Sequence, residues 1–194
     1  MPEYKAPVED MLFLLRDVFR VEDVFAELPE QKENDLETIS SILEEAGKFC
    51  SEILYPLNAT GDIEGCRLEN GVVRTPKGFA EAWKAFSDAG WGGLSAATEY
   101  GGQNLPRMVQ ILVDEMLSGS NLSFGLFPGL TRGAYEAIEA HATPELKATY
   151  LPNMVAGVWT GAMALTEGNA GSDLGLLKAT ATPRPDGSWT VTGS

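Results

Sequence analysis

Cysteine and histidine are scarce in this sequence of 194 residues, which contains two cysteines, Cys50 and Cys66, and one histidine, His141. A zinc site needs three or four such ligands grouped together, and a cysteine nucleophile needs a base close by. The cysteines do not form a CxxC pair, and neither has a histidine near it in the sequence. We therefore expect no metal site and no Cys–His nucleophile pair, and we expect the reducing cytoplasm as the compartment.

Basic residues are also few, with 14 Lys and Arg against 28 Asp and Glu, which gives a formal net charge of −14. The acidic residues are spread along the chain rather than gathered in a tail. Such a surface repels the phosphates of nucleic acids and the head groups of anionic lipids. We expect neither nucleic acid nor a membrane as a partner, and an anionic ligand would need a local pocket of backbone N–H groups or cations.

Long apolar runs are missing, since none approaches the roughly 18 to 20 residues that span a bilayer. The N-terminal stretch MPEYKAPVEDMLFLLRDVF has charges on both sides of a short apolar run and lacks the small-residue cleavage site of a signal peptide. With 44% hydrophobic and 22% charged residues, the composition is that of a globular protein. The length suits one domain, or one domain and part of another.

Helical periodicity dominates the first 155 residues. The clearest apolar stripe runs from Ile39 to Leu54, with a capping box of Asn34 and Glu37 at its start and a stop at Pro56. We interpret this stripe as core. Further helices are predicted from Thr75-Pro76 to Gly90, from about Arg107 to Leu117, from Thr131 to Ala140, and from Thr143-Pro144 to Pro152. Such a series indicates an antiparallel helical bundle.

The period changes after residue 155. The run Val158–Leu165 is typical of a buried strand, residues 177–181 alternate, and the turn Pro185-Asp186-Gly187 leads to a partner strand that begins at Trp189. Because so few strands make a poor independent sheet, we interpret the chain as a fragment. We predict a mainly α chain, with an N-terminal helical domain over residues 1–156 and the start of an incomplete β domain over residues 157–194.

The stretch from Thr166 to Gly175 is unusually rich in glycine and polar residues. Its three glycines allow positive φ and a close approach to the backbone, and successive N–H groups can bind an anion. The hydroxyls of Thr166 and Ser172 can donate to ring carbonyls or phosphate oxygens. A purely structural alternative, in which Ser172 and Asp173 cap a short helical turn, stays open, because the pattern is neither a P-loop nor GxGxxG.

The string Leu165-Thr166-Glu167-x-x-Ala170-Gly171-Ser172-Asp173 closely resembles the signature of the acyl-CoA dehydrogenases, L/V-T-E-P-x-x-G-S/T-D. The resemblance continues in residues 99–102, 144–152 and 187–193 and covers essentially the whole chain. Residues 1–11, 48–50 and 121–124 are similar to the branch that includes 3-methylmercaptopropionyl-CoA dehydrogenase. Gly168-Asn169 departs from the pattern, and the loss of the usual proline removes a fixed φ.

The resemblance implies FAD as the cofactor and an acyl-CoA thioester as the substrate of an α,β-dehydrogenation. It places Met163, Leu165 and Thr166 along the isoalloxazine, with Thr166 bonded to its pyrimidine edge. It places Gly171 and Ser172 at the pyrophosphate, and Ser172 also at the CoA arm of the substrate. It further implies an electron-transfer flavoprotein as the electron acceptor and a homodimer or homotetramer.

No catalytic residue is expected in this chain, because the base of the family comes from its C-terminal helical domain. Glu167 is therefore interpreted as structural and paired with a nearby cation, and the fragment alone is expected to be inactive. Alternatives are an acyl-CoA oxidase, a non-catalytic flavoprotein homologue that acts as a binding or interaction protein, and a helical interaction module without flavin.

Five other residues have less specific interpretations. His141 is expected at a helix end, near terminal carbonyls. Arg132 is expected as a solvated surface residue. Phe124, Phe127 and Leu130 belong either to the end of an acyl pocket, as the resemblance implies, or to ordinary core packing.

Overall fold

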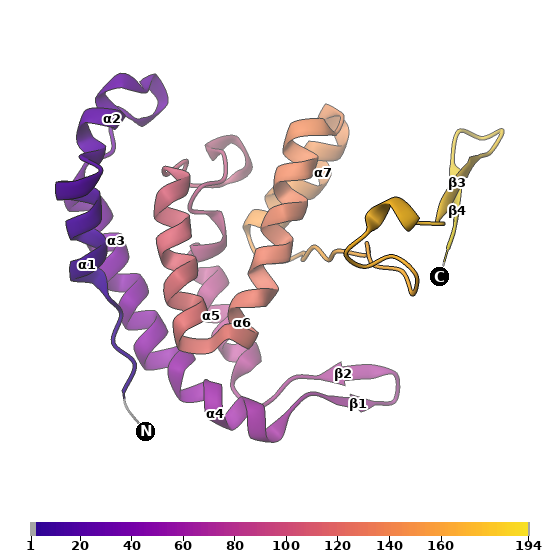
Figure 1. Cartoon of the computed structure of the whole chain (residues 1–194), viewed down its shortest axis with the longest axis horizontal. Coiled ribbons are helices and arrows are strands. Elements are labelled where there is room, and N and C mark those ends of the chain that lie inside the picture. The colour runs from indigo at the N-terminus through magenta and orange to yellow at the C-terminus, as the bar shows by residue number, and fades with distance from the viewer. Residues whose placement is uncertain (1–2, 194) are drawn as a thin grey trace. The chain divides into compact units, whose positions relative to one another are not determined.

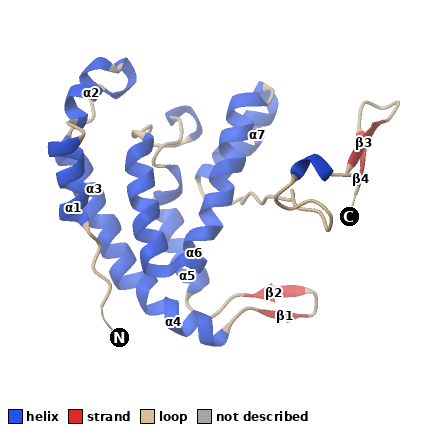
Figure 2. Cartoon of the chain, in the orientation of Figure 1, coloured by secondary structure: helices blue, strands red, loops and turns tan. Residues whose placement is uncertain are grey.

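The computed structural model describes residues 3–193 and divides into two compact units, the first ending at Gly161 and the second beginning at Ala162. Helices make up most of the first unit, whereas the second consists of a loop and a hairpin (Figure 2). The mainly helical fold class predicted from the sequence is confirmed. The domain boundary predicted from the sequence, between residues 156 and 157, lies inside the first unit. Residues 1, 2 and 194, which belong to the two predicted domains, lie outside the described residues.

The helices and strands follow one another along the chain as Figure 1 labels them. The first unit contains α1 (Val8–Phe13), α2 (Val21–Glu27), α3 (Leu36–Phe49), α4 (Tyr55–Glu64), β1 (Arg67–Glu69), β2 (Val72–Arg74), α5 (Phe79–Asp88), α6 (Arg107–His141) and α7 (Pro144–Val155). π-helical segments follow α1 and α3, namely η1 (Leu14–Val18) and η3 (Cys50–Leu54). Short 3-10 turns are η2 (Pro29–Gln31), η4 (Trp91–Gly93) and η5 (Thr98–Tyr100). The second unit contains the 3-10 turn η6 (Leu174–Leu176), β3 (Thr180–Pro183) and β4 (Trp189–Thr192).

The predicted core stripe of α3 is confirmed, but its cap is one residue later than expected. The N-cap is Asp35, whose Oδ1 accepts from the Thr38 N–H at 2.7 Å, and this hydrogen bond lowers the pKa of Asp35. The prediction of Asn34 as the N-cap is therefore wrong by one residue. Asn and Asp are both favoured N-cap residues, so the sequence alone does not distinguish Asn34 from Asp35. The buried members of the stripe are Ile39, Leu43, Ala46 and Phe49 in α3 and Cys50 and Leu54 in η3, whereas Ile53 is 38% exposed.

Pro56 does not end the helical chain, contrary to the prediction. In η3 the N–H of Tyr55 donates to the carbonyl of Cys50, five residues back, so that the helix widens before the proline. Pro56 then occupies the first turn of α4, where its missing N–H costs little. The chain stays helical as far as Glu64.

Helix α6 is a helical hairpin whose halves are joined at Asn121, a residue with non-helical backbone angles of φ −157° and ψ 90°. Two ion pairs link the halves. Arg107 lies 2.9 Å from Glu136, and Arg132 binds Asp114 through both of its terminal nitrogens. Because residues 29 and 18 positions apart meet in this way, the halves run antiparallel (Figure 1).

The side chain of Asn121 holds this turn. It is fully buried, and its Oδ1 accepts from the Phe124 N–H at 3.1 Å and from the Ser123 hydroxyl at 2.8 Å, which caps the second half of α6. Its Nδ2 donates to the carbonyl of Leu54 at 3.1 Å. One amide therefore starts a helix and ties it to the end of η3.

The remaining helix predictions differ mainly at the helix ends. The predicted segments 107–117 and 131–140 are both parts of α6, whose second half begins directly after Asn121. Helix α5 begins only at Phe79, because Gly78 precedes it with a φ of 90°, and it ends before Gly90 as predicted. Helix α7 begins at Pro144 as predicted but continues through Pro152 to Val155.

The hairpin β1–β2 and the N-terminal helices α1 and α2 were not predicted. The hairpin turns at Asn70-Gly71, where φ is 52° and 80°. Positive φ at both central residues is typical of the turn that an Asn-Gly pair favours between two strands. The Asn70-Gly71 dipeptide could therefore have predicted this hairpin from the sequence.

In the second unit, the predicted hairpin is confirmed, with Thr180 opposite Thr192 and Ala181 opposite Val191. The prediction of a buried strand over residues 158–165 is wrong. This segment is extended but not part of a strand, and 68% of Val158 and 67% of Met163 are exposed. A strand requires a hydrogen-bonded neighbour, and within the described residues no segment pairs with this one.

The N-terminal segment before α1 packs on the helices through Tyr4. The Tyr4 hydroxyl donates to the carbonyl of Met116 at 3.3 Å, and its ring stacks on Tyr55 with a centroid distance of 6.0 Å. A side chain at Gly119 would lie 3.2 Å from the Tyr4 ring, so this glycine makes room for it. Burial raises the pKa of Tyr4 to about 12, with smaller contributions from Cys50 and Glu115.

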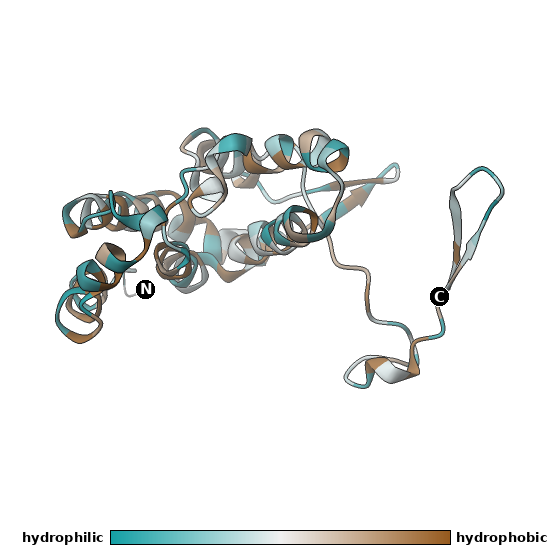
Figure 3. Cartoon of the chain, turned by 90° about the horizontal axis from the view of Figure 1, so that it is seen from above, coloured by the Kyte–Doolittle hydropathy of each residue, from teal (hydrophilic) through white to brown (hydrophobic). Residues whose placement is uncertain are grey.

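Figure 3 shows apolar and polar residues on different sides of the same helices, the pattern of amphipathic helices around a shared core. The largest fully buried side chains of this core include Phe86, Ile39, Leu43, Met116 and Leu117. No helix among residues 3–193 has both the length and the apolar character needed to cross a bilayer.

We expect Asn121→Ala to lower the free energy of unfolding by about 2 to 4 kcal/mol, because the buried Leu54 carbonyl loses its donor and the second half of α6 loses its cap. Urea unfolding followed by circular dichroism measures this loss. The control is Asn58→Ala at an exposed position of α4, for which we expect a change within about 0.5 kcal/mol. Equal losses in both variants would contradict the role of Asn121.

We expect the free energy of unfolding to fall as the pH rises from 10 to 12. In this window the Tyr4 phenol is deprotonated in the unfolded chain but keeps its proton in the folded chain, whose Tyr4 pKa is about 12. Tyr4→Phe should remove about 1 kcal/mol of this dependence, after allowance for the solvent contact of the ring. Stability curves at several pH values measure it, with the exposed Tyr150→Phe as control. Parallel curves for wild type and Tyr4→Phe would refute the assignment.

Candidate functional site

The glycine-rich loop of the second unit is closed by a turn of two residues. Glu167 and Ala170 exchange both backbone hydrogen bonds, at 3.0 and 3.1 Å, across Gly168-Asn169. Glu167 is 8% exposed and Ala170 2% exposed, whereas the surrounding loop residues are exposed. Within the described part of this loop, the two residues that close the turn are therefore the buried ones.

Side chains of this turn reach across the loop to its far end. The Glu167 carboxylate accepts from the backbone N–H of Lys178 at 2.9 Å through Oε2 and from that of Ala179 at 2.8 Å through Oε1. The Nδ2 of Asn169 donates to the carbonyl of Leu176 at 2.6 Å. We name Glu167, Asn169, Leu176, Lys178 and Ala179 the loop clasp. The expectation of a cation beside Glu167 is wrong, because its partners are backbone N–H groups.

The structural alternative for this loop is correct for one of its two residues. The Oδ1 of Asp173 accepts from the Gly175 N–H at 3.0 Å and caps the short turn η6. Ser172 takes no part in this cap, and its hydroxyl makes no hydrogen bond to any residue between 3 and 193. The capping of η6 therefore leaves Ser172 available to another group.

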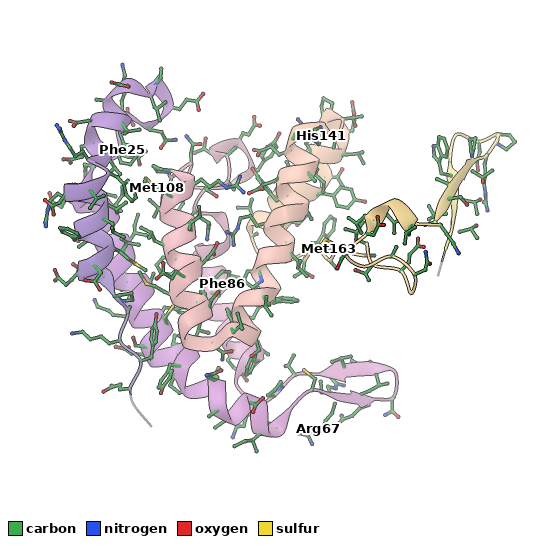
Figure 4. The ribbon with its side chains drawn as sticks, viewed as in Figure 1. Phe25, Arg67, Phe86, Met108, His141 and Met163 are labelled. Carbon is green, nitrogen blue, oxygen red and sulfur yellow. The ribbon has the colours of Figure 1, made fainter. Side chains whose placement is uncertain are left out.

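The residues expected at the cofactor all lie on the exposed side of the loop or on the segment that leads into it. Met163 is 67% and Leu165 42% exposed, and Figure 4 shows Met163 on this leading segment. A Cβ at Gly171 would lie 3.9 Å from the Thr166 methyl group, so the fold brings Thr166 next to Gly171, the residue before Ser172. The Thr166 hydroxyl, like that of Ser172, has no partner among the described residues.

The loop glycines differ from expectation in their backbone angles. Gly168, Gly171 and Gly175 are not among the described glycines with positive φ, so their backbone angles do not require glycine, although a Cβ on Gly175 would lie only 3.1 Å from the Oδ1 of Asp173. A Cβ on Gly168 would meet no atom within 4 Å, which means that the backbone there is open to an approaching group. Open backbone, two free hydroxyls and two exposed apolar side chains are the contacts that a flavin nucleotide needs, so these residues fit the expected cofactor.

Of the three residues left open between acyl pocket and core, one is buried and two are exposed. Phe124 is 4% exposed and belongs to the core, whereas Phe127 is 48% and Leu130 43% exposed. An apolar cavity of about 450 Å³ lies beside Phe124 and Phe127. Phe79 and Trp83 of α5 also line this cavity.

Two further expectations concern charged residues. His141 is the exposed last residue of α6, as predicted, and Figure 4 shows it at this helix end. Arg132 is not a solvated surface residue, since its side chain is 20% exposed and paired with Asp114. The pairing was hidden in the sequence because it depends on the turn at Asn121. Residues 3–193 contain no group of three or more His, Cys, Asp or Glu side chains that could hold a metal ion.

Comparison with known proteins places residues 37–158 in the family model "Acyl-CoA dehydrogenase, N-terminal domain". Over 191 residues the chain is 41% identical to 3-methylmercaptopropionyl-CoA dehydrogenase of Ruegeria pomeroyi, a match that covers 98% of this chain and 32% of that relative. The chain therefore spans about one third of the length of this curated relative.

Solved structures share the fold. Butyryl-CoA dehydrogenase from Megasphaera elsdenii matches with a TM-score of 0.69 and 24% identity, over 82% of this chain and 40% of that one. An acyl-CoA dehydrogenase complexed with FAD from Bacillus anthracis matches with a TM-score of 0.68 and 22% identity, over 84% of this chain and 26% of that one.

The glycines of the second unit give a matched pair of substitutions. We expect Gly168→Ala to change the free energy of unfolding by less than about 1 kcal/mol, because its Cβ enters open space. We expect Gly193→Ala to destabilise the second unit by about 1 to 3 kcal/mol, because its Cβ would lie 2.9 Å from that of Ala179. Hydrogen exchange of the backbone amides of residues 167–193 compares the stability of the second unit in the two variants. The reverse order of stability would disprove the packing at the loop clasp.

Proposed function

The chain belongs to the acyl-CoA dehydrogenase family, and we propose that it is the N-terminal part of an FAD-dependent enzyme that dehydrogenates an acyl-CoA thioester between Cα and Cβ. The observation that carries this proposal is the loop of the second unit. There the family signature is folded so that the Thr166 and Ser172 hydroxyls stay free beside open glycine backbone. The 41% identity to a dehydrogenase of the same reaction class supports it.

We assign the cofactor contacts to the residues that the signature indicates. Met163 and Leu165 supply apolar contacts to the isoalloxazine, and Thr166 donates to the polar pyrimidine edge. Gly171 and Ser172 lie at the pyrophosphate, where Ser172 also reaches the CoA arm of the substrate. When bound, FAD would supply the acceptor for the hydride that leaves Cβ.

The catalytic base is proposed to lie in a part of the polypeptide outside this chain. A base must come within hydrogen-bond reach of the α proton of the substrate, which a buried carboxylate held by the backbone cannot do without leaving its place. The only carboxylate of the signature turn is Glu167, which is 8% exposed and accepts a backbone N–H at each oxygen. This chain alone would therefore hold and orient ligands without turning over substrate.

Partners and compartment follow from the same proposal. We propose an electron-transfer flavoprotein as the electron acceptor, a homodimer or homotetramer as the assembly, fatty acid metabolism as the setting and the cytoplasm as the compartment. Free thiols at Cys50 and Cys66 support a reducing compartment. Exposed apolar side chains on the second half of α6, Leu122 and Leu126 among them, suit a face that further protein covers.

The test is the visible spectrum of the full polypeptide that carries this chain, purified without added cofactor. We expect flavin absorption near about 450 nm that bleaches anaerobically when a suitable acyl-CoA is added. Thr166→Val and Ser172→Ala should each raise the FAD Kd about tenfold, equivalent to about 1.4 kcal/mol for a lost hydrogen bond. Ser188→Ala, in the turn of the hairpin, is the control.

Three other outcomes would each change the proposal. Reoxidation of the flavin by oxygen alone would identify an acyl-CoA oxidase. Flavin that no acyl-CoA bleaches would identify a non-catalytic homologue. A protein that binds no flavin would refute the assignment of Thr166 and Ser172.

A further inference from the structure

We propose that Glu167 is the positioning residue of the flavin site, holding Thr166 and Ser172 in place through the loop clasp. The inference rests on the proposed function, since it concerns how the same loop presents its hydroxyls. It assigns Glu167 no contact with flavin or substrate. Its role is exerted through the backbone of the residues on either side.

The geometry of the carboxylate supports this role. Each oxygen accepts one backbone N–H, from Lys178 at 2.9 Å and from Ala179 at 2.8 Å. Both bonds are charge-assisted and therefore about twice as strong as bonds between neutral groups. The residue is 8% exposed, so water competes little for either oxygen. A glutamate that only kept the protein soluble or attracted charged ligands would have its carboxylate in water instead.

The position of Glu167 in the loop explains what the carboxylate fixes. Thr166 precedes it directly, and the backbone of Glu167 closes the turn to Ala170, which leads into Gly171 and Ser172. The two expected flavin-binding hydroxyls are therefore attached to opposite ends of the turn that Glu167 anchors. Release of the carboxylate would free both hydroxyls at once.

The clasp also ties the loop to the hairpin. Ala179 directly precedes β3, and Gly193, directly after β4, lies so close that its Cβ would be 2.9 Å from the Cβ of Ala179 and 3.9 Å from the Oε1 of Glu167. Glu167 thus lies beside the residue that precedes β3 and the residue that follows β4, at the open end of the hairpin. The hairpin provides the fixed support against which the loop is held.

The hairpin turn contains a matched control. Asp186 is a carboxylate of the same unit that accepts two hydrogen bonds, from the Ser188 N–H at 2.9 Å and the Ser188 hydroxyl at 2.7 Å. It closes the far end of the hairpin and is not part of the loop clasp. Loss of Asp186 removes as many hydrogen bonds as loss of Glu167 without releasing the loop.

The experiment uses the full polypeptide and compares wild type, Glu167→Ala, Glu167→Gln and Asp186→Ala. It measures the FAD Kd, the absorption band of the bound flavin and the hydrogen exchange of the Lys178 and Ala179 amides. We expect Glu167→Ala to raise the FAD Kd at least tenfold, shift the band and expose both amides. Glu167→Gln, which retains one acceptor oxygen, should lie between wild type and Glu167→Ala.

At saturating FAD, the rate of flavin reduction in Glu167→Gln should stay within about tenfold of wild type, because Glu167 is not the base. Loss of reduction by several orders of magnitude with FAD fully bound would make Glu167 catalytic and overturn the positioning role. Unchanged FAD affinity and spectrum in Glu167→Ala, or equal weakening in Asp186→Ala, would overturn it too. A wild-type protein without flavin refutes the proposed function itself, an outcome distinct from either of these.

Discussion

The buried side-chain amide of Asn121 is the interaction on which the architecture of the helical unit depends. It caps the second half of α6 and donates to the carbonyl of Leu54 at 3.1 Å. The antiparallel course of α6 follows from that turn, and with it the ion pairs Arg107–Glu136 and Arg132–Asp114. A hydrophobic core alone would not choose this turn, because apolar contacts have no direction. The hydrogen bonds of the Asn121 amide are directional, and they fix where the chain turns.

The glycine-rich loop of the second unit is ordered in a different way. Its order comes from short-range hydrogen bonds of Glu167, Asn169 and Asp173 to backbone groups within the same loop, rather than from a core. The polar side chains of the signature thus have two kinds of task. The side chains that close the loop are hydrogen-bonded to its backbone. The hydroxyls proposed to bind the cofactor, those of Thr166 and Ser172, have no hydrogen-bond partner among the described residues.

The sequence was sufficient where structure is decided locally. The stripe of α3, the end of α5 at Gly90, the start of α7 at Pro144 and the hairpin at Gly187 were all predictable, because periodicity, proline and glycine act within a few residues. Prediction from the sequence failed where the structure of a residue depends on a partner far away in the sequence. Arg132 is partly buried only because the turn brings Asp114 to it, and Val158–Leu165 is not a strand because a strand needs a neighbour. The signature identified the loop, but the N–H partners of Glu167 lie beyond it, at residues 178 and 179.

The separation in sequence of these interactions sets the order in which the chain can acquire its structure during synthesis. Leu54 precedes Asn121 by 67 residues, so its carbonyl is already present when the amide that binds it leaves the ribosome. Helix α3 and η3 can therefore act as a template on which the α6 hairpin closes. The loop clasp spans only 11 and 12 residues and needs no such template. The helical unit therefore depends on contacts between segments synthesised far apart in time, whereas every residue of the clasp is synthesised within one short stretch.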